Sequence, residues 1–138
     1  MYLLDTNVAS ELRKPDCDAA VRAWAATVDA RLLFVSALTI LEIKIGVLHV
    51  ERRDPAQAAV LSAWLDDHVL TAFAGRVLPV DFDVVMHCAG LQVPDPKPDR
   101  DALIAAATLA RGFTVVTRNV VEFSVTGVTI INPWEYTP

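Results

Sequence analysis

Short segments of almost purely apolar residues alternate along the chain with longer segments of helical periodicity, and this alternation restricts the folds it can adopt. A strand with one solvated face carries a polar residue at every second position, whereas these segments are apolar throughout. Strands buried on both faces are typical of a parallel sheet covered by helices on each side. The pattern predicts an α/β fold of three layers (α/β/α), whose central, mostly parallel sheet has four to five strands. The predicted strands are Tyr2–Asp5, Leu32–Ser36, Arg76–Val80, Thr114–Thr117 and Val128–Ile131.

The segments between these strands carry the apolar spacing expected of helices. Pro55 suits the first turn of one helix, and Gly112 suits the position just after another. Val93–Arg100 is rich in proline and is predicted to be a loop. No repeat or linker divides the chain, so one domain spanning residues 1–138 is expected. The predicted helices are Val8–Arg13, Ala19–Val28, Ala37–Val50, Pro55–Phe73, Asp83–Leu91 and Asp101–Arg111.

The composition is strongly apolar. Hydrophobic residues make up 54% of the chain and the mean hydropathy is +0.39, yet no apolar stretch reaches the roughly 18 residues of a membrane span. The excess favours a buried partner surface, and we expect self-association. Cys17 and Cys88 lie far apart without metal-ligand spacing, and no targeting segment precedes the first predicted strand. Reduced thiols and a cytoplasmic location are therefore expected.

The net charge of −5 restricts how such a chain could act on nucleic acid. Nucleic-acid binders usually carry a basic patch, but here the longest basic run is Arg52–Arg53. A site of carboxylates that bind cations would resolve the conflict, because the cations reverse the local sign of the charge.

The first predicted strand ends in a carboxylate, Asp5, followed by Thr6 and Asn7. Ligands of open α/β sheets bind outside the carboxyl ends of the strands. A single acidic residue at such an edge decides little, so the question is which other carboxylates reach it.

Glu42 interrupts a helix that is apolar on nearly every side. A carboxylate buried there must be paired, solvated through a gap or bound to a metal. Gly46 lies one turn further on the same face, and we interpret it as clearing space beside Glu42. The alternative is a charged surface stripe with Lys44, although residues two apart are not neighbours on a helix.

Three further residues have ordinary explanations as well as functional ones. Asp101 could cap the alanine-rich helix, or Asp99 could cap it and leave Asp101 in the first turn, facing inward. Asn119 could serve a turn after the fourth strand, and Glu122 could be an exposed acid. Together with Asp5 and Glu42, however, these positions can converge on one edge of a parallel sheet. Three or four oxygen donors meeting there would suit Mg²⁺, with Mn²⁺ as a substitute.

The ordered motifs resemble those of the PIN-domain ribonucleases, and most closely the FitB-like branch of the VapC toxins from type II toxin–antitoxin systems. The resemblance runs from Tyr2 to Trp134 and therefore covers nearly the whole chain. The motifs are Leu4-Asp5-Thr6-Asn7-Val8, Ser36-x-x-Thr39-x-x-Glu42-Ile43-x-x-Gly46, Asp101-Ala102-Leu103-Ile104-Ala105-Ala106, Thr117-Arg118-Asn119-x-x-Glu122-Phe123 and Asn132-Pro133-Trp134.

The resemblance implies a PIN-like fold and a role for each matching residue. It makes Asp5, Glu42, Asp101 and Glu122 metal ligands and catalytic residues, with Glu122 serving a second metal. This chain departs from the family in having Asn119 where PIN nucleases broadly carry Asp, and Glu122 where the VapC branch usually carries Asp. The residues expected to orient the ligands or to contact substrate are Thr6, Asn7, Ser36, Thr117, Arg118 and Asn119.

The resemblance also implies an activity and partners. The expected activity is that of a Mg²⁺-dependent RNA endonuclease, which hydrolyses phosphodiester bonds as the toxin of a toxin–antitoxin pair. The expected partners are RNA, a VapB-like antitoxin and a second copy of the chain, with no membrane. The departures at Asn119 and Glu122 keep open an alternative, a degenerate PIN module that binds RNA or protein without cutting it.

Overall fold

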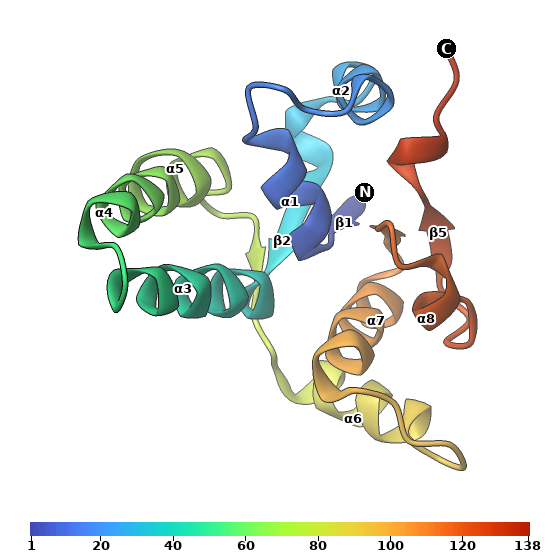
Figure 1. Cartoon of the computed structure of the whole chain (residues 1–138). Helices are drawn as coiled ribbons and strands as arrows, with labels where there is room; N and C mark the ends of the chain where they lie inside the picture. The colour runs from blue at the N-terminus through green and yellow to red at the C-terminus, as the bar shows by residue number, and fades with distance from the viewer.

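The computed structural model describes every residue from Met1 to Pro138 (Figure 1). Its central sheet consists of five parallel strands, in the order β3-β2-β1-β4-β5. The predicted α/β fold is confirmed, with every strand pair parallel. The strands are β1 (Tyr2–Leu4), β2 (Leu33–Ser36), β3 (Val77–Leu78), β4 (Thr114–Val116) and β5 (Thr129–Ile131).

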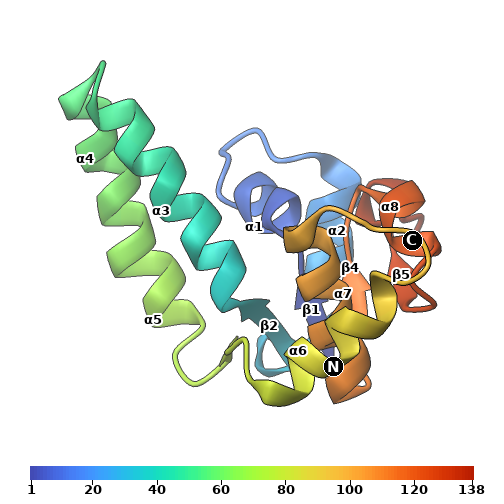
Figure 2. The same cartoon turned by 90° about the horizontal axis from the view of Figure 1, so that it is seen from below.

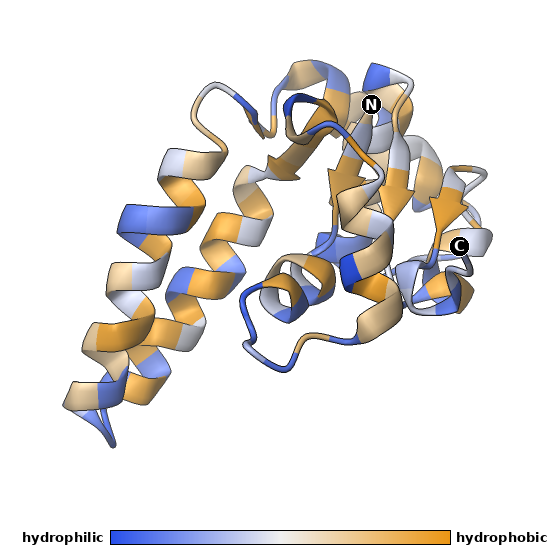
Figure 3. Ribbon diagram, turned by 90° about the horizontal axis from the view of Figure 1, so that it is seen from above, coloured by the Kyte–Doolittle hydropathy of each residue, from blue (hydrophilic) through white to orange (hydrophobic).

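The first strand lies at the centre of the sheet, where both faces are covered. Leu4 pairs with Val35 on β2 and with Val116 on β4, so three strands end at the same level. Leu3 and Leu4 are both fully buried, and they point into different cores on opposite faces. This double burial explains why the strand segments are mostly apolar, and the strands are largely orange in Figure 3.

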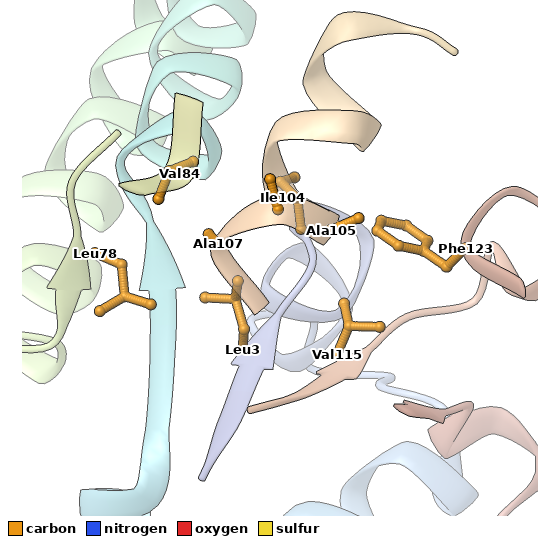
Figure 4. Packing of buried hydrophobic residues seen from close by; sticks show 9 residues of the cluster. Leu3, Leu78, Val84, Ile104, Ala105, Ala107, Val115 and Phe123 are labelled. Atoms are coloured by element: carbon orange, nitrogen blue, oxygen red, sulfur yellow. The ribbon is translucent and has the colours of Figure 1, made fainter. Parts of the chain in front are cut away.

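One face of the sheet is covered by α6 (Phe82–Leu91), α7 (Asp99–Arg111) and α8 (Val120–Ser124). Their core joins Leu3 and Val115 of the sheet to Ile104 of α7 and Phe123 of α8 (Figure 4). Small residues of α7 lie against the strands, so the helix can approach the sheet closely.

The other face is covered by α1 (Thr6–Leu12), α2 (Ala19–Ala26) and the short 3₁₀ helix η3 (Pro133–Glu135). Val8 and Trp24 fill the core on this side, and Trp134 packs against it. A second 3₁₀ turn, η1 (Ala30–Leu32), leads into β2.

A helical arm stands away from the sheet, as Figure 2 shows. It consists of α3 (Ala37–Glu51) and an antiparallel run formed by α4 (Pro55–Ala63), the π-helical segment η2 (Trp64–Val69) and α5 (Leu70–Ala72). Ile43 of α3 packs against Leu65 and Val69, two buried residues of the π-helical segment. The prediction of one helix over Pro55–Phe73 missed this change of winding.

Some boundaries differ from the sequence predictions for local reasons. β3 is only two residues long, since Pro79 follows it and has no N–H to donate. The helix predicted to begin at Asp101 begins at Asp99, and its cap residue is Pro98, without a side-chain cap. The idea that Asp99 caps this helix was therefore wrong. α8 was not predicted, because five residues are too few to show a period. No helix is long and apolar enough to cross a membrane.

Candidate active site at the carboxyl edge of the sheet

Asp5 follows the central strand directly and caps α1. Its side chain lies within the fold, with Asp5 only 4% exposed. Oδ1 accepts a hydrogen bond from the Thr6 backbone N–H (2.8 Å), and Oδ2 accepts from Thr117 Oγ1 (2.8 Å) and Asn7 Nδ2 (3.3 Å). Burial raises the pKa of Asp5, the hydrogen bonds oppose that rise, and the nearby charge of Asp101 adds to it. Asp5 is thus a buried carboxylate that lacks a cationic partner.

The turn after β4 supplies much of this support. Thr117 is fully buried, and its hydroxyl donates to Asp5 while accepting from the Asn119 backbone N–H (3.0 Å). Asn7 Oδ1 accepts from the Arg118 backbone N–H (3.3 Å) and so ties the two turns together. The Asn119 side chain is exposed and does not cap α8. The Thr6 backbone N–H and the side chains of Asn7 and Thr117 thus surround the Asp5 carboxylate as hydrogen-bond donors.

Glu42 is half-buried on α3 and faces the same region. Burial raises its pKa; the Thr6 hydroxyl opposes the rise, and the charges of Asp5 and Asp101 add to it. Arg100 is near enough to lower the pKa of Glu42 slightly. Lys44 is exposed and forms no ion pair with Glu42, so the surface-stripe alternative was wrong.

The interpretation of Gly46 as a residue that clears space is not supported. A Cβ built on Gly46 would meet nothing within 4 Å, so no close neighbour requires glycine there. Ser36 acts indirectly, since its Oγ accepts from the Leu38 backbone N–H (3.0 Å) and caps α3. Its contribution to the edge is to fix the start of the helix that carries Glu42.

Asp101 and Glu122 line a small cavity of about 180 Å³ between α7 and α8. Asp101 lies in the first turn of α7, and burial followed by the charge of Glu122 raises its pKa. The proline-rich loop forms the opposite wall. Gln92 and Lys97 hold this loop closed by hydrogen bonds between the Gln92 amide and the Lys97 backbone.

The four carboxylates are thus electrostatic neighbours, although they do not form a closed cage. No three Asp, Glu, His or Cys side chains converge enough to enclose an ion by themselves, contrary to the expectation that three or four donors would meet. Mg²⁺ usually takes one or two carboxylates and completes its shell with water and substrate phosphates. The four carboxylates form no ion pair with a basic side chain, and Glu122 is exposed to solvent, so this set of oxygen donors fits that mode of binding.

A second, larger cavity lies elsewhere. It measures about 860 Å³, runs between α1 and the α4–α5 side of the arm, and is lined mostly by apolar residues, including Leu12, Val60 and Trp64. None of the four carboxylates lines it, so size does not identify the catalytic region here.

Two residues that were not among the predicted site residues contact residues of this edge. Thr39 is fully buried, and its Oγ1 accepts from Thr6 Oγ1 (3.2 Å). Its position one turn before Glu42, on the same helix face, was an available signal. Trp134 packs against the core on the α1 side of the sheet, and its ring also lies beneath the Arg118 guanidinium.

Comparisons with known proteins identify the family and the fold. The PIN domain family model matches residues 2–126. A VapC ribonuclease, Y4jK of Sinorhizobium fredii, is 39% identical over 98% of this chain and 99% of its own length. Toxin FitB of Neisseria gonorrhoeae is 32% identical over 97% of this chain and 99% of its own length.

A solved structure gives the same result for the fold. The crystal structure of FitAcB from Neisseria gonorrhoeae superposes with a TM-score of 0.89 at 32% identity, covering 98% of this chain and 99% of that one. The sequence family and the fold therefore agree. This chain therefore belongs to the PIN domain family, among the VapC-type ribonuclease toxins that include FitB.

Proposed function

We propose that the protein is a Mg²⁺-dependent RNA endonuclease that acts in the cytoplasm as the toxin of a toxin–antitoxin pair. The observation that carries the proposal is the buried carboxylate of Asp5, which three protein donors hold at the sheet edge beside Glu42 and Asp101. A protein does not bury an acid near other acids for stability, since each raises the cost of ionising the next. The arrangement is typical of a site that binds cations.

The role of each residue follows from its position in the site. Asp5 and Asp101 would hold one ion, with Glu42 beside them, and Glu122 would serve a second ion or its water shell. Mg²⁺, when bound, offsets the charge of the scissile phosphate and stabilises the charge that develops on the departing oxygen. Thr117, Thr6 and Asn7 keep the Asp5 carboxylate fixed. Mn²⁺ would substitute because it accepts the same oxygen donors.

The direct test compares RNA cleavage by the wild type and Asp5→Asn, each with Mg²⁺ and with EDTA. Cleavage should require both the carboxylate and the metal. Asp66→Asn is a matched control, since Asp66 is exposed on the helical arm. Cleavage that persists in Asp5→Asn or in EDTA would show that the mechanism is wrong.

A non-catalytic PIN module that binds RNA or protein is the second candidate. It is favoured by the exposed positions of Asn119 and Glu122, which leave the second metal position without a buried acid. Calorimetric titration with Mg²⁺ alongside the cleavage assay separates the two. If the protein binds magnesium and cleaves RNA, the nuclease is supported. If it binds RNA but neither binds magnesium nor cleaves the RNA, the non-catalytic module is supported.

The partner that we propose is a VapB-like antitoxin, within a complex in which this chain forms a homodimer. The relative FitB is named a toxin, and the superposed structure contains FitAcB rather than FitB alone. The apolar cavity beside α1 gives such a partner a place to bury apolar side chains, because an amphipathic helix binds in a groove of this kind.

A further inference from the structure

Arg118 carries an exposed guanidinium that is held in a fixed place without a carboxylate partner. Its Cζ lies 4.9 Å from the centroid of the Trp134 ring, within the range of a cation–π contact. The ion pairs of the molecule are Lys14–Glu11, Arg31–Asp29 and Arg111–Asp81, so Arg118 takes part in none.

Both sides of this contact are anchored. The Arg118 backbone N–H donates to Asn7 Oδ1 (3.3 Å), and Asn7 Nδ2 in turn donates to Asp5 Oδ2 (3.3 Å). Two contacts hold Trp134 in place. Its backbone N–H donates to Asn132 Oδ1 (3.1 Å), and its side chain packs against the core of Leu4, Val8 and Val116. One side chain, Asn7, therefore links the backbone of Arg118 to the buried carboxylate of Asp5.

We propose that Arg118, stacked on Trp134, forms a subsite for a backbone phosphate of the RNA strand beside the scissile bond. The proposal rests on the ribonuclease function above. Stacking uses the face of the guanidinium and leaves its N–H groups, which lie in its plane, free for the two-point contact that arginine makes with phosphate. In a chain of net charge −5, a pre-positioned cation on the turn after β4, one residue beyond Thr117, offsets repulsion of the strand.

Trp134 is a positioning residue, because it acts by holding Arg118 and does not itself contact the RNA. The Trp134 ring restricts the long Arg118 side chain before RNA binds, so less conformational entropy is lost on binding. The same logic explains why lysine would be a poor replacement, because an ammonium carries the charge without the planar fork.

The experiment measures equilibrium binding of a single-stranded RNA to Asp5→Asn protein as a function of salt. Adding Arg118→Gln should reduce the slope of log K against log salt by about 0.7, the value for one phosphate contact on a single strand, and lower affinity about tenfold. Arg118→Lys should keep most of the slope yet bind more weakly. Arg53→Gln is the matched control, since Arg53 is an exposed, unpaired arginine just after α3 and should change neither quantity.

A double-mutant comparison tests the role of Trp134. Trp134→Leu alone should weaken RNA binding, and adding it to Arg118→Gln should weaken binding no further, because the cation that it positions is already gone. Thermal melts of each variant identify the temperatures at which all are folded. Additive losses would show that Trp134 acts structurally and would overturn its assigned role.

The outcomes separate this inference from the function on which it rests. If the wild type neither binds nor cleaves RNA, both are wrong. If it cleaves RNA while Arg118→Gln and Arg53→Gln give equal slopes and affinities, the nuclease stands and the phosphate subsite is wrong. Loss of binding to a protein partner but not to RNA in Arg118→Gln would also overturn the inference.

Discussion

Thr117 Oγ1 donates a 2.8 Å hydrogen bond to Asp5 Oδ2, and this buried contact joins residues 112 positions apart in the sequence. The two residues follow adjacent parallel strands that end at the same level. The hydrogen bond stabilises the charged form of Asp5, whereas burial favours the neutral form. The support that Thr117 gives to Asp5 can therefore be tested separately from the metal chemistry.

Thr117→Val should impair both stability and cleavage, because valine keeps the shape and removes the donor. Loss of a hydrogen bond to a buried charge costs about 1.5–3 kcal/mol, and we expect at least a tenfold fall in cleavage of RNA at neutral pH. Thr117→Ser retains the hydroxyl and is the matched control. Equal activities of the valine and serine variants would show that the contact does not support Asp5.

Glu42→Gln should stabilise the fold at neutral pH while reducing cleavage. Burial raises the pKa of Glu42 in the folded state, so the native protein binds more protons than the unfolded chain at pH values between the unfolded and folded pKa. Wild-type stability therefore rises as the pH falls from neutral through that window. Thermal melts from pH 7 to pH 4 should show the gap between variant and wild type closing, and a gap of constant size would contradict the prediction.

Magnesium should raise the melting temperature of the wild type. At a concentration of 100 times Kd, a single site adds about 2.7 kcal/mol to the free energy of unfolding. Asp101→Asn should lose most of this effect, whereas Asp67→Asn, an exposed acid on the arm, should keep it. Calcium and sodium titrations at matched ionic strength control for screening. An equal shift in both variants would exclude Asp101 from the metal site.

Glu122 should set the metal requirement of cleavage. Glu122→Gln should lower activity and move the Mg²⁺ titration to higher concentration, because the cavity shared with Asp101 loses one of its two carboxylates. Glu122→Asp keeps the charge and should restore most of the wild-type titration. If Glu122→Gln gives an unchanged titration, Glu122 plays no part in binding the metal.

The apolar cavity should be required for neutralisation by an antitoxin. Val60 lines it and is 63% exposed, so Val60→Glu places a charge there without disturbing the core. Co-purification with a co-expressed VapB-like antitoxin should be lost, and RNA cleavage should persist. Val121→Glu is the control, because Val121 is 78% exposed and lies outside the cavity. Equal capture by both variants would place the partner on another surface.

The elements could be read from the sequence wherever a period repeats within them. α3 and α7 each span several turns, and the apolar strands show burial on both faces, so both kinds of element were predicted within a few residues. Asp5 and Glu42 could be identified because each is an acid at an otherwise apolar position. The ends of elements were less predictable, as Asp99 shows, since capping depends on the backbone angles of a single residue.

The sequence by itself determined the alternation of strands and helices, the acids that interrupt it and the family to which the motifs point. Only the tertiary structure decided which groups meet: Thr117 with Asp5, Thr6 with Thr39, and Arg118 with Trp134. The physical reason is that periodicity and capping act within a few residues, whereas these contacts depend on strand order and register. Two short turns that follow adjacent strands are brought side by side by the sheet, and nothing local in either turn specifies the other.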